Sequence, residues 1–388
     1  MTGYRIPFTR VCVTGHEIEY LRQVIDDSHL AGDGAFAQRC HAWLESKIGC
    51  SRALLVHSAT AALEMAAMLS DAGPGDEVIM PSFTFVSTAN AFVLRGATPV
   101  FVDIAAPSMN IDPERVAAAV TKRTRAIVPV HYAGVGCDME AILNIAGQAG
   151  LIVIEDAAQA LLSTDRGRML GSVGAMAALS FHETKNVTAG EGGALLINDP
   201  ALIERAEVIR EKGTDRSRFF RGQVDKYTWV EPGSSYLPSE LMAAFLFAQL
   251  ERAEEINDRR AAVWRAYDRE LGPLEHAGRL VRQTNPGNAH MYFILLPSLA
   301  ERTGLIEQLK QRGVSAAFHY VPLHSSPAGQ RYGRAAGPLP VTEDISQRLL
   351  RLPLWPDMGG PEIEAVVSAI YDSLGERRPN GPATPIGV

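Results

Sequence analysis

The segment Leu151–Gln159, LIVIEDAAQ, has the pattern of a buried strand that ends in polar side chains. The segment Ala177–Asn186, AALSFHETKN, repeats that pattern farther along the chain. In both, apolar residues follow one another without alternation, which is typical of strands covered on both faces of a parallel sheet. Ligands of open α/β sheets bind beyond the carboxyl ends of such strands. The two segments therefore predict an α/β fold with a ligand site near Asp156 and Lys185.

Strands and helices alternate through the first two thirds of the chain, which predicts a layered α/β fold with right-handed crossovers. The predicted strands are Ala53–Val56, Glu77–Met80, Pro99–Asp103, Ala126–His131, Leu151–Asp156, Ala177–Phe181 and Gly193–Ile197. The predicted helices are Thr60–Leu69, Thr84–Leu94, Pro113–Val120, Met139–Ala149 and Ala201–Glu211.

The alternation stops after Pro238. Glu240–Leu271 is predicted as one long helix that ends at a Gly-Pro pair. The strand-like stretch His290–Leu296 and a helix near Leu305–Arg312 follow it. We predict a large α/β domain at residues 1–250, a smaller α+β domain at 251–376, and a poorly ordered Pro/Gly-rich tail at 377–388.

Composition narrows the function classes. The chain has 388 residues, of which 46% are hydrophobic and 21% are charged, as in ordinary globular proteins. Its net charge of −7 argues against a general nucleic-acid partner. Four cysteines without CxxC spacing predict neither a disulfide framework nor a zinc site. The N-terminus lacks a signal-peptide pattern, and the longest apolar run, Met242–Ala248, is too short to span a membrane, so we expect a cytoplasmic protein.

A third strand, ALLVH, ends at His57 and leads through Ser58, Ala59 and Thr60 directly into a helix. The free N–H groups and the dipole of such a helix start favour a phosphate. A phosphate cradle, a lysine and a carboxylate at one sheet edge are what pyridoxal 5′-phosphate (PLP) requires. The lysine forms a Schiff base, and the carboxylate keeps the pyridine nitrogen protonated. The three signals together therefore predict a PLP site.

Each signal also has an ordinary structural interpretation. An aspartate at a strand end is often a helix cap or an ion-pair partner, and a lysine after a strand is usually solvated. The turn at Ser58 alone is a common N-cap. Only the order and spacing of the three segments favour the cofactor.

The string SFHETKNVTAGEGGAL (Ser180–Leu195), with EDAAQ, HSATAALEMA and PSFTFVSTANA before it, resembles the DegT/DnrJ/EryC1/StrS sugar-nucleotide aminotransferases. These are PLP enzymes of the aspartate-aminotransferase fold, fold type I. The resemblance extends from about Pro7 to about Leu374. It is closest to the dTDP-4-amino-4,6-dideoxygalactose transaminase branch, through stretches such as GDEVIMPSFTFVSTANAFVLRGA and AFHYVPLH.

The resemblance implies roles for individual residues. Lys185 corresponds to the catalytic lysine that bonds to PLP and then shuttles the proton. Asp156 corresponds to the partner of the pyridinium nitrogen, Gln159 to an amide beside the ring, and Phe85 to an aromatic stacked on it. The phosphate-binding residues would be Ser58, Ala59 and Thr60, with Ser180 as a further hydroxyl.

One stretch departs from the family pattern. Many members carry an asparagine in a GYNxR-like stretch that reaches the phosphate of the neighbouring subunit. Here the stretch is Gly233–Leu237, with Ser235 at the asparagine position and Leu237 in place of the basic residue. We interpret this as a subgroup variant in which Ser235 still donates a hydrogen bond.

Substrate contacts are predicted in two segments and at His182. The basic and aromatic segment Arg216–Trp229 suits a nucleotide diphosphate, since guanidinium groups pair with phosphate and rings stack on a base. The loop FHYVPLH resembles one that closes over the sugar. The candidate residues are His182, Arg221, Lys226, Tyr227, His319 and Tyr320. The structural alternatives are a solvated charged loop and a strand end with hydrogen-bonded histidines.

The resemblance implies a homodimeric aminotransferase with shared active sites. It would move an amino group from L-glutamate to C4 of a nucleotide-linked 4-keto sugar, such as dTDP-4-keto-6-deoxyglucose, in ping-pong order. A nucleotide-linked 4-ketopentose in antibiotic-sugar biosynthesis is an alternative acceptor, because the loss of one methyl group changes few contacts.

Other classes fit less well. Sugar dehydratases of the same family replace the lysine with histidine, whereas Lys185 is present. A catalytically silent PLP-fold regulator usually lacks the lysine or the aspartate, and both are present here. A nicotinamide-dependent dehydrogenase requires GxGxxG after an early strand, and a zinc hydrolase requires HExxH; the sequence has neither.

Overall fold

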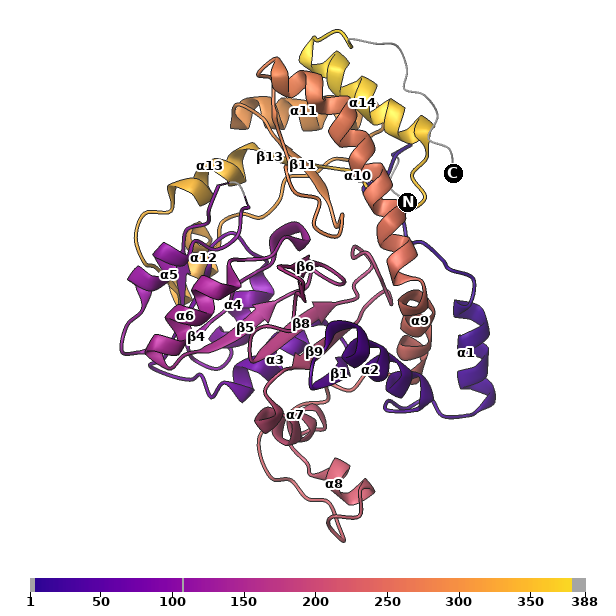
Figure 1. The fold of residues 1–388 in the computed structure, drawn as a ribbon, viewed down its shortest axis with the longest axis vertical. Helices are drawn as coiled ribbons and strands as arrows, with labels where there is room; N and C mark the ends of the chain where they lie inside the picture. Colours follow the sequence, from indigo (N-terminus) through magenta and orange to yellow (C-terminus); the bar gives the residue numbers. More distant parts are fainter. Residues whose placement is uncertain (1–3, 107, 379–388) are drawn as a thin grey trace.

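The computed structural model describes residues 4–106 and 108–378, so most of the predicted tail lies outside the described residues. An eight-stranded sheet in the order β1-β9-β8-β5-β4-β2-β3-β12 forms the large domain (Figure 1). Only β9 runs antiparallel to its neighbours. The strands are β1 (Arg52–Val56), β2 (Glu77–Pro81), β3 (Thr98–Val102), β4 (Thr124–Ile127), β5 (Ile152–Asp156), β8 (Met176–Ser180), β9 (Gly193–Ile197) and β12 (Arg334–Ala335). This confirms the predicted α/β class with a mostly parallel sheet.

The strands are buried on both faces, as their unbroken apolar runs predict. In β1, Leu54 and Val56 pack on one face, while Ala53 and Leu55 pack on the other. Helices α3 (Ala59–Leu69), α4 (Val86–Val93) and α7 (Ile203–Arg210) cover the first face. The second face is covered by α2 (Ala35–Ile48), α5 (Pro113–Ala119), α6 (Met139–Ala149) and α9 (Glu240–Glu251).

The predicted strand Ala126–His131 is too long. β4 ends at Ile127, and beyond it only Val130 forms a single bridge, to Asp156. Pro129 lies between them and has no N–H to donate to a strand ladder. The Pro129 carbonyl still accepts the Asp156 N–H at 2.8 Å, so the chain stays beside β5 without continuing as a strand.

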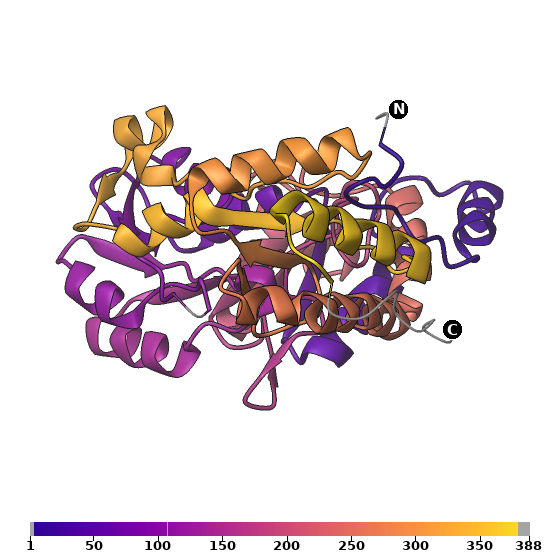
Figure 2. The ribbon, with the colours of Figure 1, turned by 90° about the horizontal axis from the view of Figure 1, so that it is seen from above.

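A smaller domain packs around a three-stranded antiparallel sheet of β10 (Val281–Arg282), β11 (Tyr292–Leu295) and β13 (Leu349–Leu352). Helices α10 (Ala253–His276), α11 (Leu299–Gln311) and α14 (Gly360–Leu374) enclose its core. Figure 2 shows them side by side over the large domain.

The division of the chain at residue 250 stays a prediction. Ile6, near the N-terminus, packs in the core of the smaller domain and bridges to Val314. The short strand β12 returns to the edge of the large sheet, beside β3. Both segments therefore cross the predicted boundary.

The predicted single helix Glu240–Leu271 is wrong in two respects. It is interrupted at Arg252, where the backbone leaves the helical range (φ −114°, ψ 12°), so that α9 packs on the large domain and α10 on the small one. Moreover, α10 continues through Pro273 to His276. Leu271 and Leu274 are fully buried, and their burial holds the last turn despite the N–H that Pro273 lacks.

In the described part of the chain, no helix combines the length and the apolar character needed to cross a membrane.

Glu240, the first residue of α9, fastens that helix to α2. Its buried carboxylate accepts hydrogen bonds from the backbone N–H groups of Gly34, Phe36 and Ala37 at 2.9, 2.9 and 3.1 Å. These groups surround the start of α2, where N–H groups have no partner within the helix. One side chain therefore caps α2 and joins it to the face of the sheet that α9 covers.

We expect Glu240→Ala to lower the free energy of unfolding by about 2–4 kcal/mol, because it leaves three N–H groups without acceptors. Urea denaturation followed by circular dichroism measures the change. As a matched control, Glu254→Ala removes an exposed ion pair with Lys47 and should change stability by less than about 1 kcal/mol. Equal midpoints for the two variants would contradict the capping role.

Candidate active site

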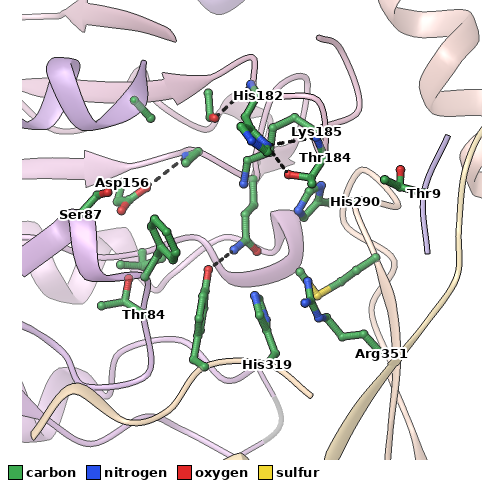
Figure 3. A pocket seen from close by; sticks show the side chains of 18 of the residues that line it. Thr9, Thr84, Ser87, Asp156, His182, Thr184, Lys185, His290, His319 and Arg351 are labelled. Atoms are coloured by element: carbon green, nitrogen blue, oxygen red, sulfur yellow. Dashed lines mark hydrogen bonds between the residues drawn. The ribbon is translucent and has the colours of Figure 1, made fainter. Parts of the chain in front are cut away.

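A cavity of about 780 Å³ lies between the carboxyl edge of the large sheet and the smaller domain. The large domain contributes Ser58, Asp156 and Lys185, from the ends of β1, β5 and β8, to its wall. The smaller domain contributes His319 and Arg351. Figure 3 shows Asp156, Lys185, His319 and Arg351 converging on one space. The strand ends singled out in the sequence thus meet at one site.

Asp156, the last residue of β5, is buried and held by two hydrogen bonds. The Thr88 hydroxyl donates to Oδ2 at 2.7 Å, and the Ala158 N–H donates to Oδ1 at 3.2 Å. Thr88 is in turn bonded to the Thr84 hydroxyl at 2.8 Å. Thr84 and Thr88 belong to the loop and helix that follow β2, so a second strand end orients the carboxylate.

Lys185 lies in the loop after β8, and its backbone N–H donates to the His182 carbonyl at 2.9 Å. Burial lowers the pKa of the Lys185 amine to about 8, with Asp156 opposing and Arg351 reinforcing that effect. Its Nζ makes no hydrogen bond or ion pair with any residue of 4–106 or 108–378. A larger fraction of the amine is therefore neutral near pH 7 than for an ordinary lysine, as a nucleophile requires.

The start of α3 forms the opposite end of the cavity. Ser58 caps the helix by accepting the Ala61 N–H at 3.1 Å, and the Thr60 hydroxyl is 2.7 Å from that of Ser87. Among the described residues, nothing accepts the N–H groups of Ala59 and Thr60, which are first-turn groups without intrahelical partners. These groups suit a phosphate.

Gly193, at the start of β9, makes this cradle possible. A Cβ there would lie 2.5 Å from the backbone N of Ala59 and closer still to Ser58, so only glycine allows β9 to pass beside the turn. With the cradle, Lys185 and Asp156 in one cavity, the residues present fit PLP: a site for phosphate, an amine for the aldehyde and a carboxylate for the ring nitrogen.

The loop with His319 and Tyr320 closes the site from the smaller domain. Gln159 accepts the Ala133 N–H at 2.7 Å and donates to the Tyr320 hydroxyl at 2.8 Å. His319 is 2.8 Å from the Tyr132 hydroxyl and stacks on the Tyr320 ring, with centroids 3.6 Å apart. Burial lowers the pKa of His319 well below its usual value, so this imidazole is neutral.

Most of the predicted site residues line the cavity together. They are Ser58, Ala59, Thr60, Phe85, Asp156, Gln159, Ser180, His182, Lys185, His319 and Tyr320. Phe85 is largely exposed at the wall, with its ring 6.4 Å from that of Tyr320. The Ser180 hydroxyl accepts the His182 N–H at 3.4 Å, and the His182 ring is 2.9 Å from the Thr184 hydroxyl. Their roles remain predictions.

The other predicted residues lie outside the cavity of the single chain. Ser235, Arg221, Lys226 and Tyr227 belong to residues 212–237, which we call the arm. The arm includes α8 (Arg216–Phe220) and projects from the body of the large domain (Figure 1). Arg221 pairs there with Glu207 at 2.6 Å. None of these four residues lines the cavity, so their roles stay predictions.

Three ionisable residues of the smaller domain line the cavity but were not predicted: Arg260 on α10, His290 before β11, and Arg351 on β13. Arg260 donates to the backbone carbonyls of Ala289 and His290 at 3.0 and 2.6 Å. Burial lowers the pKa of His290 well below its usual value. Of these three residues, only Arg351 could have been noticed in the sequence, because it is a single charged residue within the apolar run Leu349–Leu352.

A model of the DegT/DnrJ/EryC1/StrS aminotransferase family matches residues 11–371. The chain belongs to this family. It is 33% identical over 378 residues to the spore coat polysaccharide biosynthesis protein SpsC of Bacillus subtilis, covering 95% of this chain and 96% of SpsC.

Solved structures agree with this assignment. The PLP-form of Spr1654 from Streptococcus pneumoniae is 25% identical, with a TM-score of 0.87 over 96% of this chain and 99% of that one. The structure of 3-amino-5-hydroxybenzoic acid synthase is 29% identical, with a TM-score of 0.85 over 96% of this chain and 100% of that one. The predicted family, fold type and PLP cofactor are confirmed.

The lowered pKa of Lys185 predicts how PLP attaches. The rate at which protein freed of cofactor bonds covalently to added PLP should rise with pH through a midpoint near 8, because only the neutral amine attacks. Borohydride trapping followed by mass spectrometry of the Lys185 peptide measures the rate. Lys185→Ala provides the background from other lysines. A rate that still climbs steeply above pH 9.5, as for an exposed lysine, would contradict the prediction.

Proposed function

We propose that the protein transfers an amino group from an amino acid, L-glutamate, to a nucleotide-linked 4-keto sugar. One observation supports this above the others: the Lys185 amine, the Asp156 carboxylate and the start of α3 converge in one cavity. A silent PLP-fold regulator would not need a lysine of lowered pKa beside a fixed carboxylate.

Bound PLP supplies an aldehyde that condenses with amines and a ring that delocalises electrons. The N–H groups of Ala59 and Thr60 would hold its phosphate, and Asp156, oriented by Thr88, would hold the proton on the ring nitrogen. Lys185 Nζ, the neutral amine of the cavity, would hold the aldehyde end of bound PLP and would carry the substrate proton. Phe85 and Gln159, which line the cavity wall, would hold the ring in position.

The sugar acceptor is supported by the family resemblance and by the role of SpsC in polysaccharide biosynthesis. We assign dTDP-4-keto-6-deoxyglucose as the acceptor, aminated at C4, from the resemblance to the dTDP-4-amino-4,6-dideoxygalactose branch. A nucleotide-linked 4-ketopentose is the second candidate, since it differs by one methyl group. The donor product leaves before the acceptor binds, which is the ping-pong order.

We propose that the active form is a homodimer in which the arm reaches the site of the second copy. Arg221, Lys226 and Tyr227 would then hold the nucleotide diphosphate, and Ser235 the phosphate of PLP. Large apolar side chains on the arm support an interface there, since Phe220 is 68% and Trp229 74% exposed in the single chain. Exposed apolar groups of this size, gathered in one segment, mark interaction surfaces.

Purified protein loaded with PLP should lose its visible absorbance with L-glutamate and release 2-oxoglutarate. It should then aminate a nucleotide ketosugar from a panel that includes both candidates, detected by mass spectrometry. Double-reciprocal plots should be parallel. An enzyme that reacts with no amino acid, or with no ketosugar of the panel, would refute the proposal.

Two variants test the assigned roles. Lys185→Ala should reduce turnover by at least about 1,000-fold because it removes both the bond to PLP and the proton carrier. Asp156→Asn should reduce it by about 100-fold or more, since the ring nitrogen loses its charge partner. The exposed Lys310→Ala is the control and should keep wild-type turnover. Near wild-type rates for either site variant would remove that residue from its role.

A further inference from the structure

His290 lies shortly before β11, and hydrogen bonds hold its backbone at the wall of the cavity. Its N–H donates to the side-chain oxygen of Asn288 at 3.1 Å, and its carbonyl accepts from the Arg260 guanidinium at 2.6 Å. His290 is 8% exposed, and Figure 3 shows its ring among the side chains that line the cavity. The ring is therefore held in a fixed place at the site.

The side chain of Asn186, the residue after Lys185, fixes which ring nitrogen of His290 carries the proton. Its amide nitrogen lies 2.8 Å from the backbone carbonyl of Asn288, which can only accept a hydrogen bond, so this end of the amide is the NH₂ group. The same NH₂ group donates to the side-chain oxygen of Asn257 at 2.8 Å. The Asn186 oxygen therefore faces His290 Nδ1, at 3.1 Å, and only a protonated Nδ1 can donate to it.

The other ring nitrogen of His290, Nε2, is left as a hydrogen-bond acceptor. Burial lowers the pKa of His290 well below its usual value. The positive charges of Lys185, Arg260 and Arg351 act in the same direction, so the ring stays neutral and Nε2 keeps its lone pair. Nε2 forms no hydrogen bond with any residue of 4–106 or 108–378. An acceptor on a largely buried ring is costly without a donor, so a ligand must supply one.

The ligand atom that meets Nε2 must carry a hydrogen, which narrows the choice of ligand group. Ionised carboxylates and phosphates offer only acceptors, so Nε2 suits neither. Lys185 Nζ can donate, yet it forms no hydrogen bond with His290. L-Glutamate has one donor group, its amine, and the reaction consumes that amine. The remaining donors are the hydroxyl groups of the sugar.

The position of His290 selects which hydroxyl. His290 and Lys185 line the same cavity, and the charge of Lys185 acts on the His290 ring, so the ring lies near the place where the amine is transferred. In dTDP-4-keto-6-deoxyglucose the two carbons beside the reacting C4 are C3, which carries a hydroxyl, and C5, which carries a methyl group. A 4-ketopentose also carries a hydroxyl at C3. A hydrogen donor beside the reacting carbon is therefore the C3 hydroxyl in both candidates.

We propose that His290 Nε2 accepts a hydrogen bond from the C3 hydroxyl of the ketosugar, next to the carbonyl that receives the amine. Asn186 is a positioning residue, because it holds the ring proton on Nδ1. This inference rests on the proposed function and adds to it a contact that selects the sugar. No covalent bond to His290 forms or breaks.

The first test compares two ketosugars. Protein that has taken up the amino group from L-glutamate is mixed with the better of the two candidate ketosugars or with its 3-deoxy analogue. The wild type should use the 3-deoxy analogue at least about 30-fold less efficiently, because Nε2 is left without a donor. His290→Leu should lose most of this discrimination, while its reaction with L-glutamate changes less than about threefold.

Two further variants separate the hydrogen bond from other effects. His290→Gln keeps an acceptor, the amide oxygen, and should keep part of the discrimination. His276→Leu is the matched control, since His276 is an exposed histidine of the same domain that bonds to the Gly272 carbonyl at 2.8 Å, and it should behave as the wild type. The absorption spectrum of bound PLP reports whether each variant still forms the site, and if His290→Leu does not, the glutamine variant decides.

A second measurement requires neither cofactor nor substrate. NMR spectra of protein labelled with nitrogen-15 histidine distinguish protonated from unprotonated ring nitrogens, and the signals missing from His290→Gln belong to His290. Nδ1 should be protonated and Nε2 unprotonated from about pH 6 to about pH 8. Asn186→Leu, which removes the partner of Nδ1, should add the other tautomer. A proton on Nε2 in the wild type would overturn the assignment.

The outcomes separate the two proposals. If the wild type aminates neither candidate ketosugar, the proposed function fails, and the contact with the C3 hydroxyl fails with it. If the wild type uses the 3-deoxy analogue equally well, or if His290→Leu keeps the discrimination, only the contact is overturned. A loss confined to the reaction with L-glutamate would also overturn it, and would assign Nε2 to the amino-acid donor instead.

Discussion

The passage of β9 between β1 and β8 is the constraint on which the site depends. β9 runs opposite to both neighbours, so it begins at the edge where they end, and Gly193 pairs with Val56 and Ser180. A side chain at Gly193 would collide with the first turn of α3. Because that position carries none, the phosphate cradle at Ser58 and the loop with Lys185 can share one sheet edge.

The chemistry of the cavity follows from its electrostatics rather than from the charge of the whole molecule. The whole chain carries a net charge of −7. The cavity is different, because three basic side chains, Lys185, Arg260 and Arg351, line it. Burial lowers the pKa of Lys185 to about 8 and keeps His319 neutral. The site thus contains a nucleophilic amine together with the positive side chains of two arginines. The net charge of the whole chain does not reveal this local arrangement.

Much of the fold and the cofactor half of the site could be predicted because they depend on local signals. Unbroken apolar runs located the strands, and the polar residues at their ends, such as Asp156 and Lys185, had to meet at one edge of a parallel sheet. The errors arose where a long-range contact overrode a local signal. The predicted helix Glu240–Leu271 divides at Arg252 because its two halves pack on different domains, and burial of Leu274 carries α10 past Pro273.

The sequence by itself determined the class of fold, the family and the cofactor, because strand periodicity and short motifs are properties of neighbouring residues. Only the tertiary structure decided which distant side chains complete the cavity. Arg351 is far from Lys185 in the sequence, yet both side chains line the cavity. The wall of a cavity is defined by all the groups around it, and those groups come together only when the smaller domain packs over the sheet edge.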